Sequence, residues 1–311
     1  MFQKTTALIA GCGYLGRRVA RLWTNRGFTT YAMTRDTARC DEFRSDGIIP
    51  IIHNLSDAEA ALILPDPDVV LWSVGFDRRP GSNRNAIWID GLRRFLSRLP
   101  VRTTPRRIIY TSSTGVYGDG GGLEVDELTL PNPDSEGGKA CLEAEQIVRE
   151  FGDTYRHTSI ILRLAGIYGP DRLLRRVSEL RTGQPINAAP DDWLNLIHVD
   201  DAVRMIECLA ASSFAECSIV NVVSAHSVTR REYYSVLSRL VSAPEPRFSD
   251  SMSDSIAAGI SDAAGTSDVR TRRSSGNRRI VSRFRSMIPV EFQFDDCTIG
   301  LSDAVERSEG L

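Results

Sequence analysis

Short apolar runs alternate with amphipathic stretches from residue 6 to about residue 165, and this alternation restricts the fold more than any other feature of the chain. The runs have the length of strands and are apolar at nearly every position, as in strands that are buried on both faces. They are Thr6–Ala10, Thr29–Thr34, Ile48–Ile52, Val69–Val74, Arg107–Thr111 and Ser159–Leu164. We predict helices between them. The pattern therefore predicts an α/β fold, a right-handed doubly wound parallel sheet with helices on both faces.

A glycine-rich loop directly follows the first predicted strand and reads Gly11-Cys12-Gly13-Tyr14-Leu15-Gly16. It opens an amphipathic helix, which is the context that a GxGxxG dinucleotide fingerprint requires. Gly11 permits the tight turn, Gly13 lets the backbone approach the pyrophosphate, and Gly16 lets the helix pack closely. The first amides of the helix, from Tyr14 and Leu15 onward, would face the phosphates. We predict a Rossmann-type NAD(P) site here, the alternative being a tight turn without a ligand.

The end of the second predicted strand bears on the choice of cofactor. An acidic side chain at this place binds the ribose 2′-hydroxyl of NAD, whereas an arginine accommodates the 2′-phosphate of NADP. The strand ends at Thr34 and is followed by Arg35 and Asp36. Arg35 favours NADP, and Asp36 keeps NAD as the alternative. A solvated surface charge is the other interpretation of Arg35.

The pattern loosens beyond residue 165, where we predict a smaller second lobe. We assign residues 1–166 and 196–224 to the NAD(P)-binding domain, and residues 167–195 and 225–311 to a substrate lobe. Residues 249–276 are rich in Ser, Asp, Ala and Gly and poor in large apolar side chains. Such a composition buries too little apolar surface to offset the entropy lost on ordering, so this segment is predicted to be a mobile insertion.

Composition and charge exclude several classes of function. A net charge of -2 provides no long-range attraction for nucleic acid or an anionic membrane. The cysteines form no CxxC pair, which indicates a reducing cytoplasm, and no apolar run is long enough to span a bilayer. The histidines show no metal-ligand spacing, and His198 is predicted to be a hydrogen-bonded core residue. Asp200 and Asp201 are predicted to cap the helix that follows them.

Several longer motifs in the right order resemble the extended short-chain dehydrogenases, the NAD-dependent epimerase/dehydratase family, and more narrowly its atypical members with a GxGYLG loop. Residues 111–118 look like the family's SSxxVYG segment, residues 163–170 are similar to its RxxxIYGP turn, and residues 196–202 resemble its hVdD segment. The resemblance runs through nearly the whole chain. In the family an aspartate after the third strand is common near the adenine, and Asn54 takes that place here.

The resemblance also implies a catalytic Ser, Tyr and Lys, the last two spaced as YxxxK. By position, Ser113 matches the serine and Lys139 matches the lysine, but Ser135 stands at the tyrosine position. An aliphatic hydroxyl is far too weak an acid to replace a phenol, so Ser135 or Asp134 is predicted to cap the helix instead. Lys139 could still bind the nicotinamide ribose, and Ser113 could still hold a substrate oxygen.

Two functions remain open at this point. The first is an NAD(P)-dependent oxidoreductase or epimerase/dehydratase that acts by hydride transfer on a hydroxylated metabolite such as a nucleotide sugar. The second is a catalytically impaired NAD(P)-binding protein with a sensing or partner-binding role, which the serine at position 135 favours. Members of the family often form homodimers through two helices, which would be residues 84–99 and 139–150 here.

Overall fold

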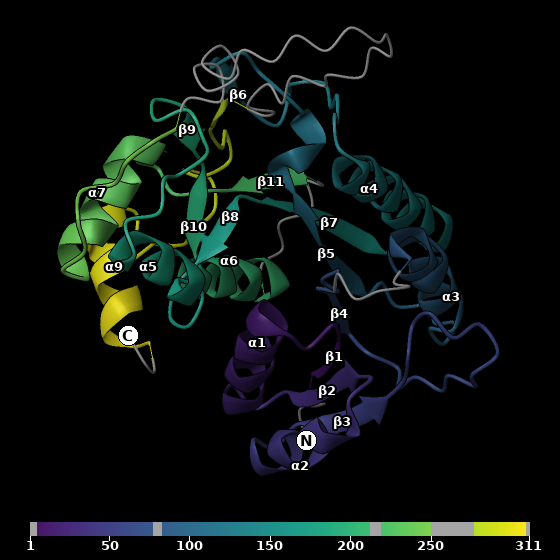
Figure 1. Cartoon of the computed structure of the whole chain (residues 1–311). Helices are drawn as coiled ribbons and strands as arrows, with labels where there is room; N and C mark the ends of the chain where they lie inside the picture. Colours follow the sequence, from purple (N-terminus) through teal and green to yellow (C-terminus); the bar gives the residue numbers. More distant parts are fainter. Residues whose placement is uncertain (1–4, 77–82, 212–218, 250–276, 309–311) are drawn as a thin grey trace, which may run out of the picture.

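The computed structural model describes residues 5–76, 83–211, 219–249 and 277–308 (Figure 1). At its centre lies a seven-stranded sheet with the strand order β11-β7-β5-β4-β1-β2-β3. Every neighbouring pair in this sheet is parallel, so the predicted doubly wound fold is confirmed. Its strands are β1 Thr6–Ala10, β2 Thr29–Thr34, β3 Ile49–Ile52, β4 Val69–Trp72, β5 Arg107–Ser113, β7 Thr158–Leu164 and β11 Ile219–Val222.

Helices cover both faces of the sheet. Helices α1 (Tyr14–Asn25), α2 (Cys40–Ser45) and α6 (Val199–Ala211) pack on one face, and α3 (Gly91–Ser97) and α4 (Glu136–Tyr155) pack on the other (Figure 1). Because successive side chains of a strand point to opposite faces, a single strand supplies both cores. In β1, Ala7 and Ile9 belong to the core under α1 and α6, whereas Leu8 and Ala10 belong to the core under α3 and α4.

A third apolar core lies among the C-terminal helices α5 (Leu174–Arg181), α7 (Arg230–Leu240) and α9 (Cys297–Glu306). It contains Tyr168, Val177, Tyr233, Leu237 and Leu301. Two-stranded pairs flank this region, namely β8 Gly166–Tyr168 with β10 Leu196–His198, β9 Trp193–Leu194 with β12 Val228–Thr229, and β6 Glu124–Val125 with β13 Arg279–Ile280. The residue boundaries of the substrate lobe stay a prediction.

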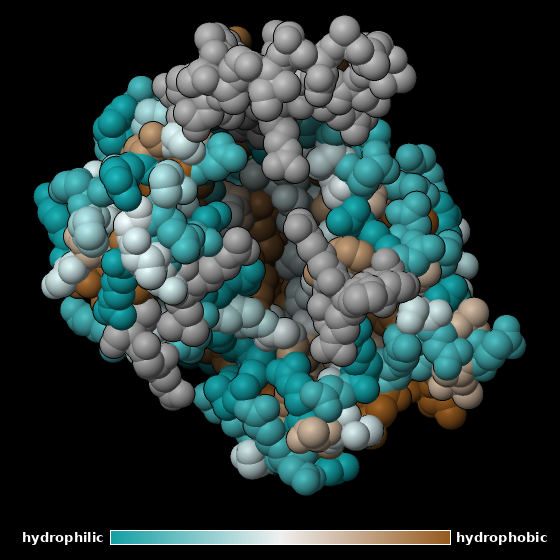
Figure 2. Space-filling model, viewed as in Figure 1, coloured by the Kyte–Doolittle hydropathy of each residue, from teal (hydrophilic) through white to brown (hydrophobic). Residues whose placement is uncertain are grey.

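Figure 2 shows a hollow at the centre of the viewed face, between the C-terminal helices and the half that carries α3 and α4, with hydrophobic side chains at its floor. The predicted mobile insertion lies outside the described residues apart from Ser249. Within the described part of the chain, no helix is long and apolar enough to cross a membrane.

Candidate functional site

Two of the three positions in the loop between β1 and α1 must be glycine, because a Cβ there would overlap backbone atoms. Gly11 has a φ of +88°, and an ideal Cβ on it would lie 2.5 Å from the backbone carbonyl of Ser73. An ideal Cβ on Gly16 would lie 2.3 Å from the backbone oxygen of Gly11. The Ser73 hydroxyl donates to that same oxygen at 2.7 Å, which joins the loop to the end of β4. These contacts fix the tight turn.

Gly13 is different, because a Cβ on it would meet nothing within 4 Å. It is the residue before α1, a helix that has no side-chain cap and no acidic residue in its first turn. The first amides of α1 are therefore left for an external anion, which the positive end of the helix favours. Tyr14 and Leu15 form this first turn; the Tyr14 hydroxyl donates to Pro170 O at 2.7 Å, and the Leu15 side chain is buried.

A pocket of about 190 Å³ opens at the carboxyl ends of β1, β2 and β4. Ligands bind at this edge in open α/β sheets. Four predicted cofactor residues line the pocket, namely Gly11, Gly13, Arg35 and Asn54. Gly16 lies in the adjoining first turn of α1, and Lys139 is not among the lining residues.

Arg39 also lines this pocket, although no motif in the sequence predicts it. Its guanidinium lies 5.0 Å from the ring centroid of Phe43. Asp36, the alternative ribose ligand, accepts a hydrogen bond from the Ala38 amide at 3.0 Å and so caps the short helix Thr37–Arg39. The Asn54 side-chain oxygen accepts from the Ser56 amide and hydroxyl, at 3.2 and 2.8 Å.

The predicted catalytic residues lie around the start of α4. Ser135 is exposed and caps this helix, since its hydroxyl accepts from Gly138 N at 3.1 Å. The Lys139 side chain is 59% exposed and forms an ion pair with Glu136 at 2.8 Å. Ser113, at the carboxyl end of β5, accepts a hydrogen bond from Gly115 N at 3.0 Å. Among the described residues, the side chains of Ser113, Ser135 and Lys139 form no hydrogen bond with one another, and only the helical backbone bond from Lys139 N to Ser135 O, at 3.0 Å, joins two of these residues.

Two nearby tyrosines cannot supply the missing phenol. The Tyr117 hydroxyl donates to Asn221 Oδ1 at 2.9 Å, and burial raises the pKa of this phenol. Tyr168 is 3% exposed, and burial raises its pKa as well. A general acid or base works best with a pKa near the operating pH. The raised pKa values of both phenols lie further from neutral pH than that of an ordinary tyrosine.

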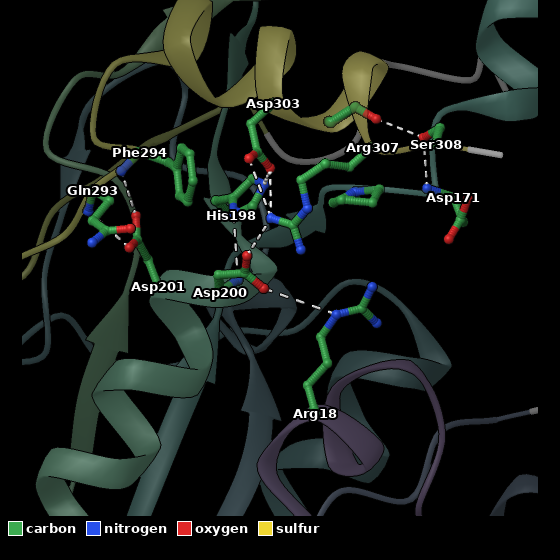
Figure 3. Close-up of polar contacts among 12 residues, drawn as sticks. Arg18, Asp171, His198, Asp200, Asp201, Gln293, Phe294, Asp303, Arg307 and Ser308 are labelled. Atoms are coloured by element: carbon green, nitrogen blue, oxygen red, sulfur yellow. Dashed lines mark hydrogen bonds and ion pairs between the residues drawn. The ribbon is translucent and has the colours of Figure 1, made fainter. Parts of the chain in front are cut away.

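The start of α6 is held against α1 and α9 by an ion-pair cluster (Figure 3). Buried His198 accepts from Asp200 N at 3.3 Å and lies 3.2 Å from Asp303 Oδ2, consistent with a hydrogen-bonded core histidine. Arg307 donates to Asp200 at 2.7 Å and to Asp303 at 3.0 Å, and Arg18 lies 3.9 Å from Asp200. Two guanidinium groups thus lie against the two carboxylates and join α6 to α1 and α9.

The cluster corrects one sequence prediction. Asp200 and Asp201 do not cap α6, because the helix begins at Val199 and contains both residues. Asp201 is fully buried and accepts from the backbone amides of Gln293 and Phe294 at 2.9 and 2.8 Å. Its carboxylate therefore holds the segment before α9 rather than the start of its own helix.

Residues 7–222 match the model of the NAD dependent epimerase/dehydratase family. Protein YeeZ from Escherichia coli strain K12 is 28% identical over 251 residues, which cover 78% of this chain and 86% of YeeZ. A conserved protein of unknown function from Silicibacter pomeroyi matches with a TM-score of 0.71 at 23% identity, covering 96% of this chain and 97% of that chain. UDP-glucuronic acid 4-epimerase from Bacillus cereus, solved in complex with NAD, matches with a TM-score of 0.74 at 15% identity over 97% of this chain and 96% of its own. At these identities the solved structures establish the similarity of fold.

Proposed function

The chain belongs to the NAD-dependent epimerase/dehydratase family, and we propose that it uses NADP to oxidise, reduce or epimerise a hydroxylated metabolite by hydride transfer. The observation that carries this proposal is the uncapped start of α1 beside Gly13, at the mouth of a pocket at the carboxyl edge of the sheet. A nucleotide sugar is the favoured substrate class, because the similar Bacillus cereus protein is a UDP-sugar epimerase. When bound, the dinucleotide supplies the hydride acceptor or donor.

The preference for NADP rests on the charges at the end of β2. Arg35 and Arg39 both line the pocket, whereas Asp36, which lies between them in the sequence, is not among the lining residues and caps the helix Thr37–Arg39. Two guanidinium groups suit a 2′-phosphate, which each can bind through paired hydrogen bonds.

Fluorescence titration with NADPH and NADH tests this preference. We expect NADPH to bind more tightly, and Arg35→Ala or Arg39→Ala to weaken NADPH binding about 10-fold each, because each removes a charge-assisted contact. NADH affinity should not change. Arg44→Ala is the matched control, since Arg44 is an exposed arginine on α2 that pairs with Asp41 at 2.8 Å. Equal affinities for NADH and NADPH would instead support NAD, and no binding of either would refute the proposed function.

In the catalytic step, we propose that Ser113 holds a substrate oxygen and that Lys139 binds the nicotinamide ribose. Lys139 would have to leave Glu136 to do so, which is a small change for an exposed ion pair. Ser135 keeps its capping role and transfers no proton. The second candidate function, an NAD(P)-binding protein without turnover, is favoured by this same residue. A homodimer through the surfaces of α3 and α4 stays a prediction.

Ser135→Tyr distinguishes the two functions. The residue is exposed, so a larger side chain fits, and loss of the cap costs about 1 kcal/mol. Ser135→Phe is the matched control, because it has the same bulk and the same lost cap but no hydroxyl. We expect the tyrosine variant to reduce NADP with UDP-glucose or UDP-glucuronate about 100-fold faster than the phenylalanine variant, the usual size of a general acid–base contribution. Equal rates would show that position 135 is not the acid–base position. Tight NADPH binding without turnover by the wild type would support the second function.

A further inference from the structure

Arg84 contacts two aromatic side chains near the dinucleotide pocket. Its Cζ is 4.5 Å from the ring centroid of Phe76 and 5.5 Å from that of Trp88, and the two rings are 6.0 Å apart. Phe76 follows Gly75 and Trp88 follows Ile87 in the sequence, and both Gly75 and Ile87 line the pocket. Phe76, Arg84 and Trp88, which we name the Arg84 cluster, therefore include two residues that are sequence neighbours of pocket-lining residues.

Two buried donors of this cluster have no acceptor. Arg84 Nε and Trp88 Nε1 are inaccessible to solvent, and neither donates a hydrogen bond to any described residue. No described carboxylate forms an ion pair with Arg84, because the neighbouring Glu136 pairs with Lys139 at 2.8 Å instead. Buried N–H groups usually have a partner, so two unpartnered donors close together are available to an acceptor from outside the chain.

The local backbone is unusual at the same place. Trp88 lies in a π-helical segment, Ala86–Asp90, which precedes α3. Such segments are rare and occur frequently at functional sites. The irregular turn thus coincides with the two orphaned donors.

The Arg84 guanidinium also reaches the first turn of α4. An ideal Cβ on Gly137 would lie 4.0 Å from Arg84 Cζ. Because residue 137 is a glycine, no side chain of that residue stands between the helix and the guanidinium. The positive end of this 20-residue helix adds to the charge of Arg84.

We propose that the Arg84 cluster binds an oxyanion of the substrate, a carboxylate or phosphate group, next to the bound dinucleotide. Aromatic faces hold the guanidinium in one plane, and its donor edge can then bind two oxygens at once. The indole N–H of Trp88 would supply a further donor. This inference rests on the proposed function, and it adds that the substrate places a carboxylate or phosphate group at Arg84.

Indole N–H signals in ¹H–¹⁵N spectra test the proposal. The chain has four tryptophans, and Trp88→Phe identifies the signal of Trp88. The full-length protein would be titrated with malonate, with inorganic phosphate and with uncharged 1,3-propanediol, at constant ionic strength, with and without NADPH. We expect malonate or phosphate to shift the Trp88 signal saturably. The anion that binds more tightly would show whether the substrate group is a carboxylate or a phosphate. Propanediol should have no effect.

Variants of Arg84 complete the test. Arg84→Gln should weaken anion binding at least 10-fold. Arg84→Lys should weaken it several-fold, because an ammonium keeps the charge but loses the paired donors. Arg93→Gln, at an exposed arginine of α3 that lies 3.7 Å from Glu143, should bind like the wild type. Unchanged signals of Trp23, Trp72 and Trp193 would show that each variant is folded.

This experiment distinguishes failure of the Arg84 oxyanion site from failure of the cofactor proposal. NADPH binding with no saturable anion shift, or with an anion shift that persists in Arg84→Gln, would overturn the Arg84 site and leave the cofactor proposal standing. Saturable anion binding without any NADPH binding would overturn the cofactor proposal instead.

Discussion

Replacing Gly13 with aspartate is expected to weaken NADPH binding at least about 100-fold, about 2.7 kcal/mol, while leaving the free energy of unfolding unchanged or slightly higher. The φ of Gly13 is -86°, outside the left-handed region, and a Cβ there meets nothing within 4 Å. Aspartate is also a favoured residue before a helix, and α1 has no side-chain cap. The new carboxylate would occupy the amides that the pyrophosphate needs and would repel it.

Alanine variants of the same loop separate folding from binding. Gly13→Ala adds bulk without charge, so we expect a smaller loss of affinity than with aspartate. Gly16→Ala should destabilise the protein by about 2 kcal/mol or more, because its Cβ would overlap the backbone oxygen of Gly11. Urea unfolding and NADPH fluorescence measure the two effects. Wild-type NADPH affinity in Gly13→Asp would show that the loop is not the cofactor site.

The sheet could be predicted because its strands are buried on both faces, which makes each of them a continuous apolar run. The strand ends were harder to predict. β4 ends at Trp72, since Ser73 turns to donate to Gly11, while β5 extends to Ser113. Both ends depend on contacts between segments that are distant in the sequence, and local periodicity does not record such contacts.

The candidate site likewise contains residues that local sequence predicts and residues that it does not predict. The glycine loop is predictable, because its turn and its helix are adjacent in the sequence. Arg39 and the Arg84 cluster were missed, because these residues follow no periodic pattern and belong to no sequence motif. The sequence does contain a signal for a buried ion pair that was also missed. Arg163 is a charged residue inside the apolar run of β7, and such a residue requires a buried partner.

That partner is Glu145 on α4. Arg163 donates to its two carboxylate oxygens at 3.0 and 2.7 Å, and the Ser112 hydroxyl donates to it at 2.6 Å. Both charged side chains are nearly inaccessible, at 3% and 4% exposure. Burial opposes the charge of Arg163, but its hydrogen bonds with Glu145 outweigh this effect and hold its pKa above the ordinary value. The pair joins α4 to β5 and β7 beside Ser113.

We expect Glu145→Gln to lower the free energy of unfolding by about 3–5 kcal/mol, because it leaves a buried guanidinium without its counter-ion. Glu143→Gln is the matched control on the same helix, since Glu143 is half-exposed and lies 3.7 Å from Arg93; its effect should stay within about 0.5 kcal/mol. The double variant Glu145→Gln/Arg163→Met removes both charges and should recover much of the loss, because the cost of a broken buried pair comes mainly from the charge left behind. Urea unfolding of the three variants measures these differences. A loss below about 1 kcal/mol in Glu145→Gln would mean that water reaches Arg163 and that the pair does not hold α4 to the sheet.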